Sequence, residues 1–312
     1  MSLAYLLALE AKESAHSDAI WGIHFSPTSH IISVSASGQV HAYDSTSGQL
    51  SASAPAHTLG VTSLSVGTDG KKVLYNTIEG LTCLWDIESG EVLGRWESYR
   101  RKGEGGPAWS VSLNPSGATY TATGGGGNVT IHSADPPSFG EPQAKLSSGR
   151  NKFGMFCKHS PDGNRLALSS ETGQIYIFDL ASTQLSATYT SHAMAVRSLS
   201  WSPDSQLLLS ASEDKRMILH DIRGAGGAVA SLTGHTSWVL SNDISPDGRL
   251  VVSGSADRTA KLWDLTTRTC VSTIQDPCAG EVWGVSWAKR GPSAFVTGGE
   301  DGVARVFRAG GA

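Results

Sequence analysis

A short motif recurs along the chain at an almost constant interval, and this repeat constrains the fold more than any other feature. Its fullest copy contains Gly234-His235, the turn Ser245-Pro246-Asp247-Gly248, and Lys261-Leu262-Trp263-Asp264. Positions equivalent to the Trp-Asp pair are separated by 42, 47, 46, 42, 43 and 44 residues, and they are Tyr43-Asp44, Trp85-Asp86, His132-Ser133, Phe178-Asp179, His220-Asp221, Trp263-Asp264 and Phe307-Arg308. This interval predicts four short strands with their turns in each copy.

A second marker repeats in step with the first. A proline turn precedes the second strand of most copies, at Ser26-Pro27, Asn114-Pro115, Ser160-Pro161, Ser202-Pro203 and Ser245-Pro246. Proline fixes φ at the first corner of such a turn, and the glycine that usually follows takes the positive φ. Two markers that agree over nearly the whole chain make the repeat a strong signal.

The repeat predicts an all-β fold in which seven sheets form one closed ring. A single four-stranded sheet cannot bury both faces, whereas seven sheets stacked radially share a continuous core. We therefore expect one domain, 1–312, that is a seven-bladed β-propeller, with repeats at about 14–48, 55–90, 105–135, 150–182, 190–224, 233–267 and 279–308. The last repeat lacks an outer strand, and residues 3–9 form a strand-like run without a blade of their own, so this run should complete the last blade.

The order of these motifs resembles the WD-repeat family. The resemblance implies that His235, Ser253, Asp257 and Trp263 form a hydrogen-bonded structural tetrad. A similar set recurs as His192, Ser210 and Asp214, and part of it as His16 and Ser33. Because a catalytic triad is made once and this set is made repeatedly, we interpret it as a folding device.

Four further copies depart from the tetrad. The serine and aspartate positions hold Tyr75 and Glu79 in the second copy, Ala122 and Gly126 in the third, and Leu168 and Thr172 in the fourth. We expect these three blades to be held mainly by packing. In the seventh copy Pro277 lies near the histidine position.

Composition argues against several other functions. The net charge is −4 and 17% of residues are charged, so we expect no direct nucleic-acid binding. The basic run Arg100-Arg101-Lys102 is interpreted as a solvated loop, with RNA contact as the alternative. Scattered cysteines and histidines predict no disulfide, metal or cofactor, and the short apolar run at 3–9 predicts no membrane span.

Large apolar residues that the repeat does not require point to a partner-binding site. We expect the innermost strands to begin at Trp21, Thr62, Trp109, Met155, Arg197, Leu240 and Trp283. With Phe153 and Trp238 two positions earlier in their copies, these residues should surround one mouth of the ring. Clustered tryptophan and arginine are typical of protein-binding hot spots, so the predicted partner-binding set is Trp21, Trp109, Phe153, Met155, Arg197, Trp238, Leu240 and Trp283. The alternative is that the rings only pack the channel wall.

Several stretches are similar to one subfamily, the WD-repeat subunit of the superkiller complex. They are residues 16–21, 192–199, 202–208, 234–240, 263–271 and 282–285, and the similarity is most specific over 190–287. It implies a cytoplasmic and nuclear adaptor that joins a tetratricopeptide scaffold and an RNA helicase in exosome-dependent 3′ to 5′ mRNA decay. In fungi it also implies a meiotic role through a topoisomerase-like partner.

Two other functions stay open at this point. One is a substrate receptor or a signalling or chromatin scaffold of another WD-repeat subfamily. The other is a propeller enzyme, which would need an inward cluster of titratable groups. The inner-strand positions read as apolar or small, so we expect no catalytic residue.

Overall fold

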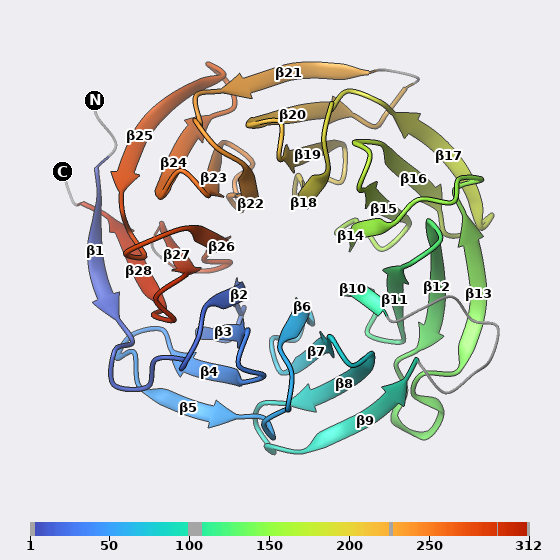
Figure 1. Cartoon of the computed structure of the whole chain (residues 1–312), viewed down its shortest axis with the longest axis horizontal. Coiled ribbons are helices and arrows are strands. Elements are labelled where there is room, and N and C mark those ends of the chain that lie inside the picture. Colours follow the sequence, from blue (N-terminus) through green and yellow to red (C-terminus); the bar gives the residue numbers. More distant parts are fainter. Residues whose placement is uncertain (1–3, 99–107, 225–226, 292, 311–312) are drawn as a thin grey trace.

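The computed structural model describes residues 4–98, 108–224, 227–291 and 293–310, and within them it is built almost wholly of β-strands. Seven antiparallel sheets of four strands each surround a central axis (Figure 1). One short 3-10 turn, η1 (Pro136–Ser138), lies between two strands of the third sheet. The predicted all-β, seven-bladed propeller is confirmed.

The strands of each blade run from the hub to the rim in chain order. Blade 1 comprises β2 (Ile20–Phe25), β3 (His30–Ser35), β4 (Val40–Asp44) and β5 (Leu50–Ser53), and blade 2 comprises β6 (Val61–Val66), β7 (Lys72–Thr77), β8 (Leu81–Asp86) and β9 (Val92–Glu97). Blade 3 comprises β10 (Ala108–Leu113), β11 (Thr119–Gly124), β12 (Asn128–Ser133) and β13 (Pro142–Ser147), and blade 4 comprises β14 (Gly154–His159), β15 (Arg165–Ser170), β16 (Ile175–Asp179) and β17 (Gln184–Tyr189). Blade 5 comprises β18 (Val196–Trp201), β19 (Leu207–Ser212), β20 (Arg216–Asp221) and β21 (Ala228–Thr233), and blade 6 comprises β22 (Val239–Ile244), β23 (Leu250–Ser255), β24 (Thr259–Asp264) and β25 (Thr269–Gln275). Blade 7 comprises β26 (Val282–Trp287), β27 (Ala294–Gly299), β28 (Arg305–Ala309) and, from the other end of the chain, β1 (Tyr5–Glu10).

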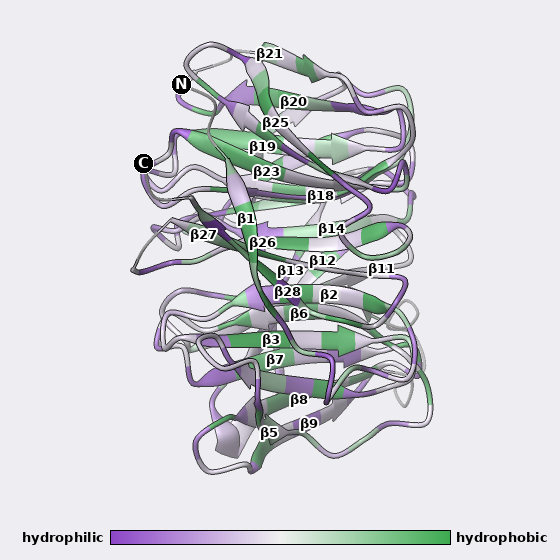
Figure 2. Cartoon of the chain, turned by 90° about the vertical axis from the view of Figure 1, so that its left-hand side faces the viewer, coloured by the Kyte–Doolittle hydropathy of each residue, from purple (hydrophilic) through white to green (hydrophobic). Residues whose placement is uncertain are grey.

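Strand β1 closes the ring, as the sequence predicts. It pairs antiparallel with β28 from Tyr5 opposite Ala309 to Glu10 opposite Arg305, and it lies on the outer surface of blade 7 (Figure 2). Tyr5 packs against the rings of Trp287 and Phe295, with centroids 5.7 and 5.3 Å away. The Arg305 Nε donates a 2.7 Å hydrogen bond to Glu10. Residue 3 of the predicted strand lies outside the described residues.

The hydrophobic core lies between neighbouring blades. Trp85 of blade 2 is fully buried in a cluster that includes Val34 and Val40 of blade 1 and Val61 of its own blade. Similar clusters join the other blades around the ring. Each interface buries apolar faces that a single blade would expose, which explains why the repeats fold as one unit.

The recurring proline turns adopt the predicted backbone, with one difference. The fourth turn residue has positive φ at Gly117, Gly163 and Gly248, as expected for glycine. Ser29 and Ser205 adopt the same conformation, with φ of 64° and 60°, although they carry a side chain. The turn geometry is therefore kept in blades 1 and 5 without glycine.

Candidate functional site

The tetrad of blade 6 forms one continuous hydrogen-bond network. Trp263 Nε1 donates to Ser253 Oγ over 2.9 Å, and that hydroxyl lies 2.7 Å from His235 Nε2. The other ring nitrogen, Nδ1, lies 2.8 Å from Asp257 Oδ2. A neutral histidine that donates from Nδ1 and accepts at Nε2 satisfies all three partners. Burial opposes the charge of Asp257, but hydrogen bonds from His235 and Thr259 hold the pKa of this carboxyl well below its usual range.

Blade 5 holds the same network with one exchange. His192 contacts Ser210 Oγ and Asp214 Oδ2, both at 2.8 Å. His220 stands in the position of the tryptophan and lies 3.3 Å from the same serine hydroxyl. Burial lowers the pKa of His192, and the hydrogen bond to Asp214 only partly offsets this effect.

The other blades use partial or substituted versions. His16 Nε2 lies 2.6 Å from Ser33 Oγ in blade 1, and Cys278 Sγ lies 3.5 Å from Thr297 Oγ1 in blade 7. In blade 2 the Tyr75 hydroxyl takes the serine position, 3.1 Å from His57 Nε2. Blade 2 therefore has a hydrogen bond in addition to the expected packing, because a tyrosine hydroxyl can replace that of serine. Leu168 of blade 4 is fully buried in an apolar cluster, as expected.

A ring of serines, which the sequence analysis missed, links neighbouring blades near the hub. Ser63 Oγ and Ser65 Oγ on β6 each accept a 2.9 Å hydrogen bond from a backbone N–H of β10. Ser286 accepts from Phe25 N over 3.2 Å and so joins blade 7 to blade 1. The same kind of bond joins Ser110 to Cys157, Ser112 to His159, Ser198 to Asn242, Ser241 to Val285, and Asp243 to Trp287. The available signal was serine at alternate positions of the innermost strands.

The predicted mouth residues occupy one equivalent position in all seven blades. It is the second residue of each innermost strand, not the first as expected. In every blade this residue falls at a register shift between the first and third residues, as between Ile20 and Gly22 around Trp21. A bulge leaves its extra residue unpaired and re-aims its side chain. We call these the mouth residues: Trp21, Thr62, Trp109, Met155, Arg197, Leu240 and Trp283, and all seven line a central cavity of about 730 Å³.

Residues that precede the innermost strands extend the mouth. The rings of Trp109 and Phe153 meet edge to face with centroids 5.8 Å apart. The Arg197 guanidinium lies 6.0 Å from the Trp238 ring, and its Nε donates a 2.7 Å hydrogen bond to Glu213. Trp238 is 43% exposed.

The mouth rings are held in place but not covered. Trp21, Trp109 and Trp283 are half-buried, whereas Leu240 is buried. A Cβ added to Gly60, just before β6 of blade 2, would lie 2.7 Å from the Trp21 ring. The indole can occupy this position because residue 60 has no side chain. The structure therefore brings six of the predicted residues to one cavity and joins Phe153 and Trp238 to them through Trp109 and Arg197.

Deeper in the channel the wall is polar, which the sequence analysis did not expect. The fifth residue of each innermost strand also lines the cavity, and we call these the throat residues: His24, Ser65, Ser112, Lys158, Ser200, Asp243 and Ser286. The expectation that inner positions are apolar or small is wrong at His24, Lys158 and Asp243, whereas the four serines agree with it. It failed because successive side chains of a strand point to opposite sides, so these polar residues reach the channel while their apolar neighbours along the strand pack between blades.

Across the described ranges, no three side chains of His, Cys, Asp or Glu lie close enough together to hold a metal ion. No helix in the same part of the chain is long and apolar enough to cross a bilayer. The basic run at 100–102 lies outside the described residues.

Comparison with known proteins identifies the repeat. The family model "WD domain, G-beta repeat" matches residues 9–44, 183–221, 226–264 and 268–308. These ranges hold strands of blades 1, 5, 6 and 7, whereas blades 2 to 4 carry the substituted tetrad positions.

Several curated proteins are similar over most of their length. The chain is 35% identical to the meiotic recombination protein rec14 of Schizosaccharomyces pombe over 255 residues, which are 81% of this chain and 80% of that protein. It is 30% identical to the WD repeat-containing protein VIP3 of Arabidopsis thaliana over 66% of this chain and 67% of that protein. It is 27% identical to the WD repeat-containing protein SL1-17 of Schistosoma mansoni over 71% of this chain and 72% of that protein.

Proposed function

Because this chain belongs to the WD-repeat family, we propose that it is a non-catalytic adaptor whose channel mouth captures segments of partner proteins. The assembly we propose is the superkiller complex, in which the chain would join a tetratricopeptide scaffold to an RNA helicase for exosome-dependent mRNA decay. The proposed locations are the cytoplasm and the nucleus. Neither direct nucleic-acid binding nor a membrane enters this proposal.

The observation that carries the proposal is the accessible aromatic mouth. Three half-buried tryptophans, Trp21, Trp109 and Trp283, project from bulges of a rigid ring. Rigid aromatic side chains lose little conformational entropy on binding, and tryptophan and arginine are enriched among binding hot spots. Arg197, held by Glu213 and Trp238, adds a fixed hydrogen-bond donor beside the rings.

A second role in meiotic recombination is favoured by one specific comparison. The similarity to the protein named meiotic recombination protein rec14 covers four fifths of both chains. In this role the same mouth would bind a topoisomerase-like meiotic protein. Partners that share one mouth would compete for it.

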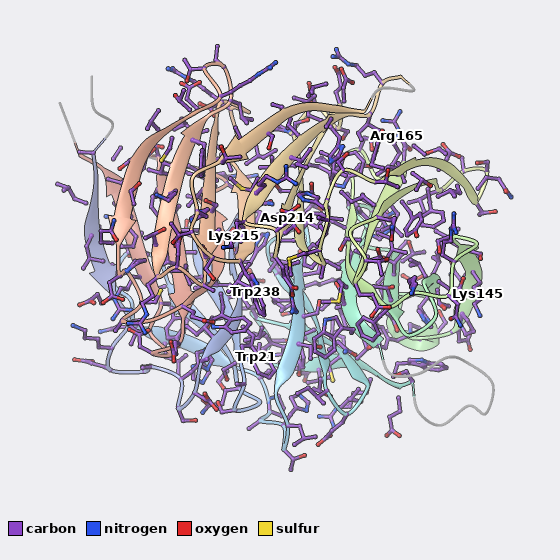
Figure 3. The ribbon with its side chains drawn as sticks, turned by 45° about the horizontal axis from the view of Figure 1, so that its top comes forward. Trp21, Lys145, Arg165, Asp214, Lys215 and Trp238 are labelled. Atoms are coloured by element: carbon purple, nitrogen blue, oxygen red, sulfur yellow. The ribbon has the colours of Figure 1, made fainter. Side chains whose placement is uncertain are left out.

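Affinity purification from the native cell tests the proposal. The variant combines Trp21→Ala, Trp283→Ala and Arg197→Glu, and a matched control combines Leu50→Ala, Leu185→Ala and Lys145→Glu. The control changes two exposed leucines on outer strands and a lysine on β13, far from the hub (Figure 3). We expect the mouth variant to lose the scaffold and helicase at least about tenfold, since central aromatic hot spots each contribute 2 kcal/mol or more.

The outcome separates the candidate functions. Recovery of the scaffold and helicase from vegetative cells supports the mRNA-decay role, and recovery of a topoisomerase-like protein from meiotic cells supports the second. Other partners would favour a different WD-repeat scaffold. A folded mouth variant that retains every partner would refute the proposed site.

A further inference from the structure

The throat residues contain one cation that the protein itself does not neutralise. Asp243 Oδ2 accepts 2.8 Å bonds from Lys289 Nζ and from Trp287 N. Within the described residues, Lys158 makes no ion pair and no side-chain hydrogen bond, although it lines the same cavity. Two ammonium groups therefore share one carboxylate.

Neighbouring histidines do not add to the positive charge of the two lysines. Burial, with the charges of Lys289 and Lys158, lowers the pKa of His24 to about 3. Burial and the charge of Lys158 lower the pKa of His159 to about 3. Both rings are neutral near pH 7, so they add no positive charge to the two lysines of the throat. Burial also lowers the pKa of Lys158, because an ammonium without a partner is costly away from bulk water.

A second observation points to a missing acceptor in the same place. Asn242 is 5% exposed and lines the cavity, and both polar atoms of its amide lack a hydrogen-bond partner. Buried amides are normally satisfied, so such a group calls for an explanation. An anion in the throat would offer an acceptor to the Nδ2 donor of this amide, but not a donor to its Oδ1.

We propose that the throat is a binding site for one small oxyanion, a carboxylate or a phosphate group, with Lys158 as its main ligand. Lys158 stands where blades 2, 3 and 7 have Ser65, Ser112 and Ser286, which are bonded to the next blade. Blade 4 lacks this serine hydrogen bond to the next blade and has the Lys158 side chain in the channel wall instead. Other groups join blade 4 to blade 5 here, since Trp201 Nε1 donates to the Lys158 carbonyl over 3.1 Å.

The arrangement suits binding better than catalysis. Asp243 is committed to a backbone N–H and to Lys289, so it is not free to act as a general base. The two neutral histidines are too weakly basic to accept a proton near pH 7.

The oxyanion can come from either of two sources. The throat lies three residues below the mouth along each strand, roughly 10 Å. An acidic group on a captured segment could span this depth, and so could a free ion from solution. The site itself does not depend on the proposed partner function.

Titration of the full chain with inorganic phosphate tests the site. The readout is the NMR signals of the methyl groups of Leu199 and Val285, which lie in the channel wall. We expect saturable shifts, weakened roughly tenfold or more by Lys158→Met, as for loss of a hydrogen bond to a charged group. Lys145→Met, on exposed β13, should bind like the unchanged protein. Asp243→Asn should bind phosphate more tightly, because it removes the competing carboxylate and keeps an acceptor for Trp287 N.

Each result has a definite meaning. Equal phosphate shifts in Lys158→Met, the absence of saturable shifts, or weaker binding by folded Asp243→Asn would overturn the proposal. A bromide-soaked crystal should show anomalous density beside Lys158, which gives a second measurement. Repeating the titration on the partner-bound assembly identifies the source: a blocked throat means that the partner supplies the oxyanion, and continued phosphate binding means a free ion. The mouth variant should still bind phosphate, so this test and that of partner capture can fail separately.

Discussion

Replacing Ser253 with alanine should destabilise the propeller through two unsatisfied groups. Ser253 is fully buried, and its hydroxyl lies between Trp263 Nε1 at 2.9 Å and His235 Nε2 at 2.7 Å. Alanine keeps the Cβ and removes one oxygen, so little apolar contact is lost. The indole N–H and the imidazole nitrogen are then left buried without their partner.

The size of the effect follows from these two groups. An unsatisfied buried donor or acceptor costs about 1–3 kcal/mol, so Ser253→Ala should lose about 2–5 kcal/mol of unfolding free energy. The corresponding fall in Tm is about 3–8 °C for a chain of this size. Trp85, the equivalent indole of blade 2, is already buried with no acceptor, so the fold tolerates one such donor and the variant should still fold.

Ser200→Ala provides the matched control. Ser200 is also a buried serine, but its hydroxyl has no hydrogen-bond partner in the structure. Removing this hydroxyl breaks no hydrogen bond, so we expect a change in unfolding free energy of about 0.5 kcal/mol or less. The corresponding change in Tm is less than about 2 °C. Thermal unfolding followed by circular dichroism compares the two variants at one pH and scan rate. Equal losses for both would refute the argument, because they would show that the network adds nothing beyond the loss of a buried hydroxyl.

Two further predictions concern closure of the ring and pH. Tyr5→Ala should lower the unfolding free energy by about 3–5 kcal/mol, because Tyr5 packs on Trp287 and Phe295 and its hydroxyl lies 2.6 Å from Ser293 Oγ. Chemical denaturation measures this loss. A loss below about 1 kcal/mol would mean that β1 closes the blade through its backbone alone. Burial lowers the pKa of His16, His24 and His159 to about 3 from an ordinary value of 6.5, so the unfolded chain takes up protons in this range that the folded chain does not. Stability should therefore be fully present above pH 6.5 and fall as pH drops from there toward 3, by about 1.4 kcal/mol per pH unit for each histidine. Denaturation curves at pH 7, 6 and 5 check the slope, and a flat profile would contradict the assigned burial.

The fold was predictable because its signals are local and repeated. The spacing of the Trp-Asp positions and of the proline turns fixed seven sheets, and the missing last strand matched the run before His16. The histidine networks of blades 5 and 6 were predictable for the same reason, since each lies within one repeat. Tyr75 shows the limit: a hydroxyl from a different side chain fills the serine place, which residue type alone did not indicate.

The sequence by itself determined which residues lie at the hub, because position within the repeat fixes distance from the axis. Only the tertiary structure decided how they point. The bulge that turns Trp21 and its six equivalents into the channel depends on pairing between two strands, and the place of the Trp21 ring depends on Gly60 in the next blade. The throat needed the closed ring as well, since Lys158, Asp243 and Lys289 come from blades 4, 6 and 7 and share one cavity only when the ring closes. Side-chain direction and charge balance across a channel are set by contacts between distant segments, and periodicity within a segment carries no information about them.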